Sequence, residues 1–311
     1  MTGVKPRIKN VLATRSFMRV FKGNRFIFVF HDISDSNEPH FSKEYSTPVS
    51  RFREQLDLLQ KIFKIIPLEQ IVTDKNLKRD KNYAAITFDD GFYSVFKRAR
   101  SILKEKGIPY AVFLNGSAIK DNQLWFSNIE IAGKSYEKQI LEISQTVLAD
   151  GEDPISAIYS RGKFNQYFRE NYKLKEAGKK IYMDTDDIKL LRQEGVLIGS
   201  HSYDHFALGF CDELTAREQI EDNHKLLKEI TNQTIRHFAI PFGKKKHYNK
   251  NTISVLKESG HTFIYSANPN KFKAKDLNRS DFFFPRIGIT DQTPRELLFM
   301  INRTLFKKYD L

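Results

Sequence analysis

Residues 84–91 read AAITFDDG, so that an apolar and β-branched run from Ala84 to Phe88 ends in Asp89, Asp90 and Gly91. The run predicts a buried strand with two acids at its carboxyl end. Adjacent carboxylates repel each other unless a cation neutralises them or one of them takes up a proton. On these residues alone the triplet has two interpretations: a functional pair of acids, or a turn whose aspartate caps the following helix.

Similar runs recur along the chain, with helical patterns between them. The predicted strands are Phe26–Phe30, Ala84–Phe88, Tyr110–Leu114, Val196–Gly199, Arg236–Ile240, Thr262–Ser266 and Phe283–Ile287. The predicted helices are Val49–Phe63, Tyr93–Lys106, Thr185–Gln193, Glu213–Ile230, Lys250–Glu258 and Thr293–Phe306. Strands that alternate with helices indicate an α/β fold with a mainly parallel sheet, and this number of strands favours a closed or nearly closed barrel.

Residues 120–184 interrupt this alternation, because they contain charged helical patterns and no clear strand. We interpret them as a helical insertion in a barrel that spans residues 26–311. The insertion contains Trp125, the single tryptophan of the chain. Trp125 either packs the insertion onto the barrel or offers a flat apolar face on which a sugar ring can stack.

The composition is that of a globular protein with a sizeable core. The chain has 311 residues, of which 40% are hydrophobic and 29% are charged, and these fractions exclude disordered, collagen-like and coiled-coil proteins. No stretch approaches the roughly 18–20 apolar residues that a transmembrane helix needs. The single cysteine, Cys211, excludes an internal disulfide and a metal site built from several cysteines.

The net charge of +13 is concentrated at the amino terminus, where residues 1–25 contain seven basic residues and no acid. Within residues 11–22, apolar and basic side chains fall on opposite faces at helical spacing. This segment is either a terminal helix packed across the barrel or a basic amphipathic helix on an anionic membrane. No signal-peptide pattern is present, so we expect a cytoplasmic protein, peripheral on the inner face of the membrane in the second interpretation. The basic residues form no recognisable nucleic-acid-binding motif.

A second motif follows the apolar run that ends at Ile198. Residues 197–205 read LIGSHSYDH, which places His201 and His205 four residues apart after a strand. Two such imidazoles can face one metal ion if the backbone coils there. With one aspartate they form a set of two histidines and one carboxylate, which leaves metal positions open for water and substrate.

Two other strand ends carry candidate residues. Pro241, Phe242 and Gly243 form either a simple turn or a rigid loop whose backbone N–H acts as an oxyanion donor. His31 follows the first predicted strand directly. The carboxyl ends of barrel strands meet on one face, where active sites lie, and all of these motifs fall at such ends.

The motifs at Thr87–Gly91, His201–His205 and Pro241–Gly243, in this order, resemble those of the polysaccharide deacetylase family, carbohydrate esterase family 4. The resemblance covers Phe26 to Ile289 apart from the insertion. It implies a deformed (β/α) barrel, here of about seven parallel strands. It also implies one divalent metal ion, usually Zn²⁺, and the hydrolysis of N- or O-acetyl groups on sugars.

Carried over residue by residue, the resemblance makes Asp89 the general base and Asp90, His201 and His205 the metal ligands. An arginine of the third family motif is replaced by Ala239, and Arg286 is our candidate for its role. The usual carboxyl-terminal catalytic histidine is missing, because no histidine follows His261. A branch that acts on poly-N-acetylglucosamine carries this histidine near its amino terminus, and Phe30-His31 resembles that motif.

The expected mechanism uses His31 as the general acid and the N–H of Phe242, with the metal, to hold the oxyanion. Pro241, Trp125 and Lys244 are expected to contact substrate. Lys244 begins a run of three lysines at the rim, which suits an anionic substrate such as a lipid-linked sugar or an acidic polysaccharide in cell-surface glycan biosynthesis. Two alternatives remain: a glycan-binding barrel with little turnover, and a hydrolase of another amide such as a formylated sugar.

Overall fold

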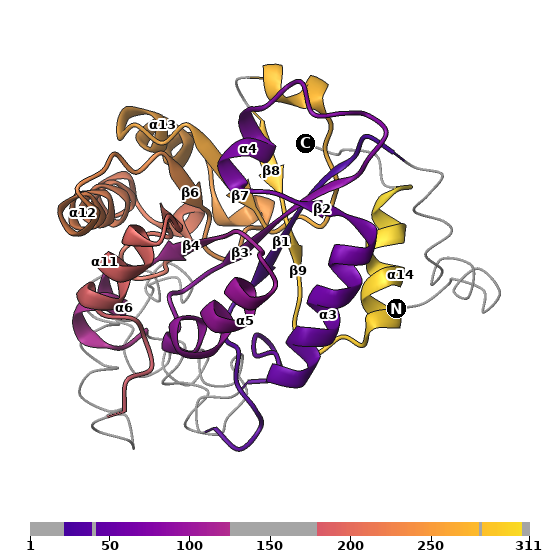
Figure 1. Ribbon diagram of the computed structural model, residues 1–311. Helices are drawn as coiled ribbons and strands as arrows, with labels where there is room; N and C mark the ends of the chain where they lie inside the picture. The colour runs from indigo at the N-terminus through magenta and orange to yellow at the C-terminus, as the bar shows by residue number, and fades with distance from the viewer. Residues whose placement is uncertain (1–21, 39–41, 125–178, 280–281, 307–311) are drawn as a thin grey trace, which may run out of the picture.

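The computed structural model describes residues 22–38, 42–124, 179–279 and 282–306, and these build one nearly closed barrel of parallel strands (Figure 1). The strands are β1 (Arg25–Phe30), β2 (Lys64–Ile65), β3 (Tyr83–Phe88), β4 (Tyr110–Leu114), β5 (Leu197–Ser200), β6 (His237–Ala239), β7 (Phe263–Ser266), β8 (Phe283–Pro285) and β9 (Ile287–Gly288). Their order in the sheet is β8-β7-β6-β5-β4-β3-β1-β9, and β2 pairs with β3. The predicted α/β barrel is therefore confirmed.

The predicted single strand Phe283–Ile287 is wrong in one respect, because the chain breaks it at Arg286. β8 pairs with β7 on one side of the break, and β9 pairs with β1 on the other. Pro285 has no N–H to donate to a neighbouring strand, which favours the end of β8 at this point. The two end strands of the sheet are thus joined through the single residue Arg286. We call this position, where the ends of the sheet meet, the seam of the barrel.

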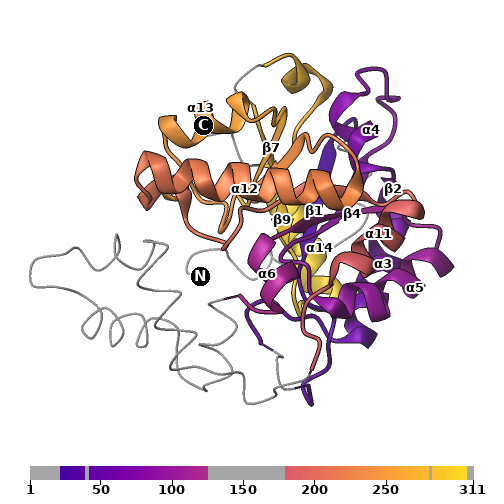
Figure 2. The ribbon, with the colours of Figure 1, turned by 90° about the vertical axis from the view of Figure 1, so that its left-hand side faces the viewer.

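Helices cover the outside of the barrel. They are α3 (Val49–Ile62), α4 (Leu68–Thr73), α5 (Arg100–Glu105), α6 (Gly116–Asp121), α11 (Thr185–Gln193), α12 (Glu213–Thr231), α13 (Lys250–Glu258) and α14 (Pro294–Thr304). The predicted helix Tyr93–Lys106 is instead a π-helical turn, η1 (Val95–Ala99), followed by α5. Short elements such as β2, α4 and α6 were not predicted. Figure 2 shows the long helix α12 lying across the outside of the sheet, with α13 beside it.

The strands read as continuous apolar runs because both of their faces are covered. All six residues of β1 are buried, and so are all six of β3. Phenylalanine rings fill much of this core: the ring of Phe63 on the helix side lies 5.0 Å from that of Phe26 and 5.6 Å from that of Phe28. A sheet that is buried on both faces cannot alternate apolar and polar residues, which explains the pattern seen in the sequence.

Arg25, the last of the seven basic residues that the sequence analysis grouped at the amino terminus, begins β1 and is buried. Its guanidinium donates to the carbonyl oxygens of Ile71 and Asp74 at the end of α4, each over 2.7 Å. This arginine therefore serves the fold and is not part of an exposed basic surface. The amphipathic segment predicted within residues 11–22 lies, up to residue 21, outside the described residues.

The described ends of the predicted insertion lie side by side. The side-chain oxygen of Asn122 accepts from the backbone N–H groups of Ile181 and Tyr182, both over 2.9 Å. The N–H of Met183 donates to the carbonyl of Gly91 over 2.9 Å. The chain thus leaves and re-enters the barrel beside the Asp89–Gly91 turn. Most of the insertion, including Trp125, lies outside the described residues.

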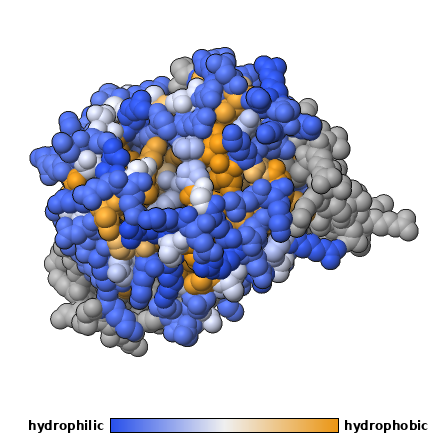
Figure 3. All heavy atoms as spheres, viewed as in Figure 1, coloured by the Kyte–Doolittle hydropathy of each residue, from blue (hydrophilic) through white to orange (hydrophobic). Residues whose placement is uncertain are grey.

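The surface seen from the side of Figure 1 is largely polar, with apolar side chains visible in a hollow near its centre (Figure 3). A cavity of about 670 Å³ opens at the amino-terminal ends of the strands, where it is lined by Tyr110, Leu197 and His237 among others. His237 is held there by Glu69 and by the hydroxyl of Tyr265, over 2.6 and 2.7 Å. Among the residues that the structure describes, none of the helices combines the length and the apolar composition that a transmembrane span requires.

Candidate metal centre and active site

A second cavity, of about 360 Å³, opens at the carboxyl ends of the strands and gathers the residues singled out in the sequence. It is lined by Val29, His31, Glu44, Tyr45, Asp89, Asp90, His201, His205, Ile240, Phe242, Ala267, Arg286 and Gly288. Most of these residues follow β1, β3, β5, β6 or β7 or lie at the barrel seam, and Val29 and Gly288 lie within β1 and β9. Because the carboxyl ends of parallel barrel strands converge, motifs that lie far apart in the sequence meet here.

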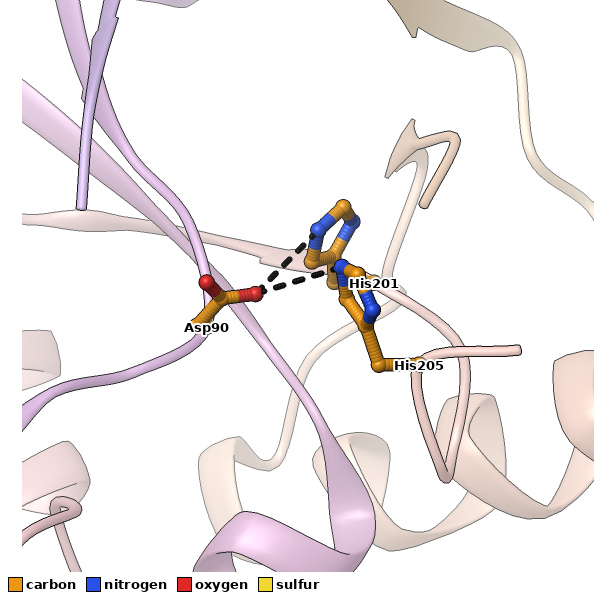
Figure 4. A group of neighbouring side chains, drawn as sticks. All are labelled: Asp90, His201 and His205. Carbon is orange, nitrogen blue, oxygen red and sulfur yellow. Dashed lines mark ion pairs between the residues drawn. The ribbon is translucent and has the colours of Figure 1, made fainter. Parts of the chain in front are cut away.

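Asp90, His201 and His205 form a compact group of three potential metal ligands. Their ligand atoms lie within 4.8 Å of one another, and all three side chains are buried. Figure 4 shows both imidazole rings turned toward the Asp90 carboxylate. Asp90 Oδ1 lies 3.5 Å from His201 Nε2 and 3.4 Å from His205 Nε2. Ligands that each lie about 2.1 Å from one tetrahedral ion are about 3.4 Å apart, so the two distances from Asp90 match those of ligands that share a zinc-like ion.

A second contact fixes the direction of the His201 ring. Its Nδ1 lies 2.7 Å from the carbonyl oxygen of Ala239, which can only accept, so Nδ1 carries the hydrogen. The lone pair of Nε2 then faces Asp90, as a metal ligand requires. Burial is the main cause that lowers the pKa of both His201 and His205, so both rings are neutral near pH 7. Ala239, which stands where the family motif has an arginine, thus supports the metal site through its backbone.

The backbone around the site adopts left-handed conformations. The described chain has six non-glycine residues with positive φ, and four of them are Asp90, Ser202, His205 and Phe242, with φ between 58° and 68°. Such conformations cost of the order of 1–3 kcal/mol each and persist only where the surroundings enforce them. The other two, Asn122 and Asn232, end helices α6 and α12, where this conformation is ordinary.

Three buried amide side chains hold the His201–His205 loop in this shape. Asn115 donates to the carbonyl of Ser202 over 3.0 Å. Gln219 on α12 accepts from the N–H of Asp204 and donates to its carboxylate, both over 2.7 Å. Asn223, one turn along α12, donates to Ser200 Oγ over 2.8 Å. None of the three amides has any exposed surface, so their hydrogen bonds are made away from competing water.

Asp89, beside the potential metal ligand Asp90, is bound by Arg286. The two guanidinium nitrogens donate to Asp89 Oδ1 over 2.7 Å and to Oδ2 over 2.6 Å, and both side chains are buried. Burial by itself would raise the pKa of Asp89, but Arg286, followed by His201 and His31, lowers it below its ordinary value. Asp89 is therefore an ionised carboxylate in a buried site. Arg286 reaches it from the barrel seam, while Ala239 offers no side chain that could.

His31 lines the cavity next to Asp89. β1 and β3 are paired in register up to Phe30 and Phe88, and the N–H of Asp89 donates to the carbonyl of Phe30 over 3.0 Å. His31 and Asp89 are thus neighbours at the ends of adjacent strands. Burial lowers the pKa of His31 to about 4; Asp89 opposes this shift and Arg286 adds to it. The imidazole is neutral in the resting protein near pH 7.

The Pro241–Gly243 loop borders the metal centre through Phe242. The ring of Phe242 lies edge-on between His205, at 4.6 Å, and His247, at 5.2 Å. A Cβ at Gly243 would lie 2.1 Å from the backbone nitrogen of Ala267, so only glycine fits there. Pro241, which precedes Phe242 in the sequence, is buried, and Lys244, which follows Gly243, is exposed. Neither Pro241 nor Lys244 is among the residues that line this cavity, and their contact with substrate stays a prediction.

The structure adds residues that the sequence analysis did not select. Glu44 and Tyr45, in the loop between β1 and α3, line one wall of the cavity. The ring of Tyr45 stacks on that of Phe92 at 5.3 Å. Phe92 in turn packs at 4.9 Å against Tyr182, where the chain returns from the insertion. No motif marks Glu44 or Tyr45, because the loop that carries them has no regular pattern.

Comparison with known proteins agrees with this geometry. Residues 76–264 match the family model described as polysaccharide deacetylase. No curated protein sequence matches the chain. Among solved structures, the deacetylase PplD of Streptococcus pyogenes in complex with acetate has a TM-score of 0.59 at 15% identity. The match covers 90% of this chain and 98% of PplD.

Two further structures share the fold. IcaB from Ammonifex degensii has a TM-score of 0.58 at 17% identity, with 90% of this chain and 97% of IcaB covered. A de-N-acetylase from Aggregatibacter actinomycetemcomitans has a TM-score of 0.59 at 12% identity, with 89% of this chain and 99% of that protein covered. Each of these similarities covers a larger share of the chain than residues 76–264 do.

Proposed function

Because this chain belongs to the polysaccharide deacetylase family, we propose that it is a metal-dependent hydrolase that removes acetyl groups from the nitrogen of amino sugars in a glycan. The proposal rests on one observation: a group of potential metal ligands and a candidate general base with its arginine partner lie in the same cavity. Asp90, His201 and His205 can bind a metal ion, and Asp89 with Arg286 forms a buried, ionised base beside them. Because both Asp89 and its partner Arg286 are present, we favour an enzyme over the alternative of a glycan-binding barrel without turnover.

Asp90, His201 and His205 would hold one divalent ion, which we propose to be Zn²⁺. When bound, such an ion polarises a carbonyl group and lowers the pKa of water. It also explains how Asp89 and Asp90 can both remain ionised side by side, since a cation neutralises their repulsion. The neutral imidazoles and the orientation of His201 by the Ala239 carbonyl suit this role.

Asp89 is the proposed general base. It takes one proton from the attacking water, whose oxygen bonds to the acetamide carbon. Arg286 keeps the Asp89 carboxylate fixed by two hydrogen bonds, and each carboxylate oxygen retains a lone pair for the proton. The N–H of Phe242, on the strained loop beside His205, is the proposed donor to the oxyanion that develops on the carbonyl oxygen.

His31 is the proposed donor of a proton to the leaving nitrogen as the carbon–nitrogen bond breaks. Since His31 is neutral at rest, the proton that it delivers is the one that Asp89 removes from water, passed between neighbouring residues just beyond the ends of β1 and β3. Water thus supplies the oxygen to acetate and a proton to the sugar amine. An amine is a poor leaving group, so this protonation matters more for an amide than for an activated ester.

The test uses metal-loaded protein and oligosaccharides of N-acetylglucosamine, with free acetate and new amine measured together. Equal amounts of both products support the proposal. Formylated and O-acetylated sugars as parallel substrates separate N-deacetylation from the two related hydrolytic activities. Release of acetate by a His201→Ala protein at the wild-type rate would argue against the metal site.

We also propose a cytoplasmic enzyme that meets its glycan, or a lipid-linked precursor, at an anionic membrane surface. The support is the cluster of basic residues near the amino terminus, together with the exposed run Lys244–Lys246 beyond the Phe242 loop. Co-sedimentation with anionic vesicles at low salt, for the full chain and for a chain without residues 1–21, tests this. Equal and negligible binding by both would leave an enzyme without membrane contact.

A further inference from the structure

Asp32 directly follows His31 and is completely buried, yet it is not among the residues that line the active-site cavity. Its carboxylate accepts hydrogen bonds from three serine hydroxyl groups. Ser94 Oγ donates to Oδ1 over 2.6 Å, Ser46 Oγ donates to Oδ2 over 2.7 Å, and Ser34 Oγ also donates to Oδ2. A buried carboxylate is tolerated only when such donors replace its hydration, so this group is an organised feature of the fold.

The three serines come from two connections that lie far apart in the sequence. Ser34 and Ser46 belong to the loop between β1 and α3, and Ser94 follows the Asp89–Gly91 turn at the end of β3. Ser94 Oγ also accepts from the N–H of Ile33 over 3.0 Å. The N–H of Thr47 donates to the Asp32 carbonyl over 2.9 Å. One carboxylate therefore ties the exit of β1 to the exit of β3.

The hydrogen bonds of Asp32 lie just beyond the last paired residues of β1 and β3. The ladder between β1 and β3 ends at Phe30 and Phe88, and His31 and Asp89 come next. Successive side chains of an extended segment point to opposite sides. His31 lines the cavity, while the side chain of Asp32 points to Ser94 and Ser46 on the other side of the chain. A shift of the Asp32 carboxylate would therefore move His31 as well.

We propose that Asp32 is a positioning residue, which fixes His31 relative to Asp89 for the transfer of a proton to the leaving nitrogen. The inference rests on the proposed function, because it assigns Asp32 a role only through His31. Misplacing a catalytic group by about 1 Å can lower a rate by about 100-fold, so a rigid anchor next to the general acid has a clear use.

The experiment compares two substrates that differ in their need for leaving-group protonation. An N-acetylglucosamine oligosaccharide needs it, whereas p-nitrophenyl acetate releases a stable phenolate without it. In Asp32→Ala we expect kcat for the oligosaccharide to fall about 10–100-fold, the usual effect of removing an orienting partner, with KM and metal content unchanged. Hydrolysis of p-nitrophenyl acetate should change by no more than a few-fold. Asp32→Asn, which keeps an acceptor oxygen, should recover part of the loss.

Asp35→Ala is the matched control, because Asp35 lies in the same loop, is exposed, and its carboxylate accepts from the N–H of Val49 at the start of α3. It should leave both activities near the wild-type values. If Asp32→Ala does not fold, Ser94→Ala removes one donor and keeps the carboxylate, and the same selective loss is expected at smaller size. Equal loss on both substrates, or no loss on either, overturns the inference. A wild-type protein that releases acetate from p-nitrophenyl acetate but not from any acetylated sugar overturns the proposed function, and the inference with it.

Discussion

Arg286 connects the two end strands of the barrel sheet and also binds Asp89. Its guanidinium donates to both oxygens of the Asp89 carboxylate, over 2.7 and 2.6 Å, from the single position at which the chain passes from β8 to β9. The arginine therefore reaches Asp89 from the seam of the sheet, whereas the Ala239 position of the third family motif lies on β6. Our predictions concern this pair and the proposed metal ligands beside it.

Replacing Arg286 by glutamine should lower both stability and activity. The change leaves Asp89 buried without its cationic partner, and breaking a buried pair in this way costs about 3–5 kcal/mol of the free energy of unfolding. Denaturant unfolding measures this effect. The matched control is Arg236→Gln, which breaks an exposed pair with Glu69 and should cost about 1 kcal/mol or less. A fully stable Arg286→Gln protein would contradict the account of the seam.

Asp89→Asn should bind metal as tightly as the wild type and still lose activity by about 10²–10⁴, the usual worth of general acid–base catalysis. The amide is isosteric but cannot take the proton of water. Metal titration by calorimetry and acetate release, measured on the same preparation, separate binding from catalysis. Near-normal turnover in Asp89→Asn would remove Asp89 from the mechanism.

Gln219→Ala should weaken metal binding although Gln219 touches no ligand atom. The amide makes two hydrogen bonds to Asp204, inside the His201–His205 loop, and holds a backbone that is otherwise unfavourable. Loss of such outer support commonly lowers metal affinity about 10–100-fold. Gln233→Ala, an exposed amide just after the same helix, is the control and should leave the affinity unchanged. Equal affinity in both variants would mean that the loop holds its shape without Gln219.

The buried amides of the site could not be predicted from the sequence, in contrast to other parts of the site and fold. The strands, the Asp89–Asp90 pair and the spacing of His201 and His205 could be predicted, because burial on both faces and convergence at strand ends leave patterns along the chain. Asn115 and Gln219 have no such pattern, since their partners are groups in the His201–His205 loop that only the fold brings close. The break at Arg286 was missed for the same reason: one arginine in an apolar run looks like part of a strand until its partner Asp89 is seen.

We expect His261 to lower the stability of the protein in acid. Burial, followed by the neighbouring His224, lowers the pKa of His261 to about 3, whereas an unfolded histidine titrates near its ordinary value of 6.5. The unfolded chain therefore binds a proton first as the pH falls, and the stabilisation that exists above pH 6.5 is lost between about pH 6.5 and 3. In metal-free protein, His261→Gln should flatten the dependence of the unfolding free energy on pH over this range. An unchanged slope would show that His261 does not titrate in this way.

The most direct test of the central claim is the titration of chelator-treated protein with Zn²⁺ while acetate release from an N-acetylglucosamine oligosaccharide is followed. We expect no release without metal, a rise that saturates at one ion per chain, and an equal amount of new amine. Asp89→Asn protein, carried through the same titration, should bind one ion and release almost no acetate. Acetate release that is independent of metal, or saturated metal binding with no acetate from the wild type, would contradict the account.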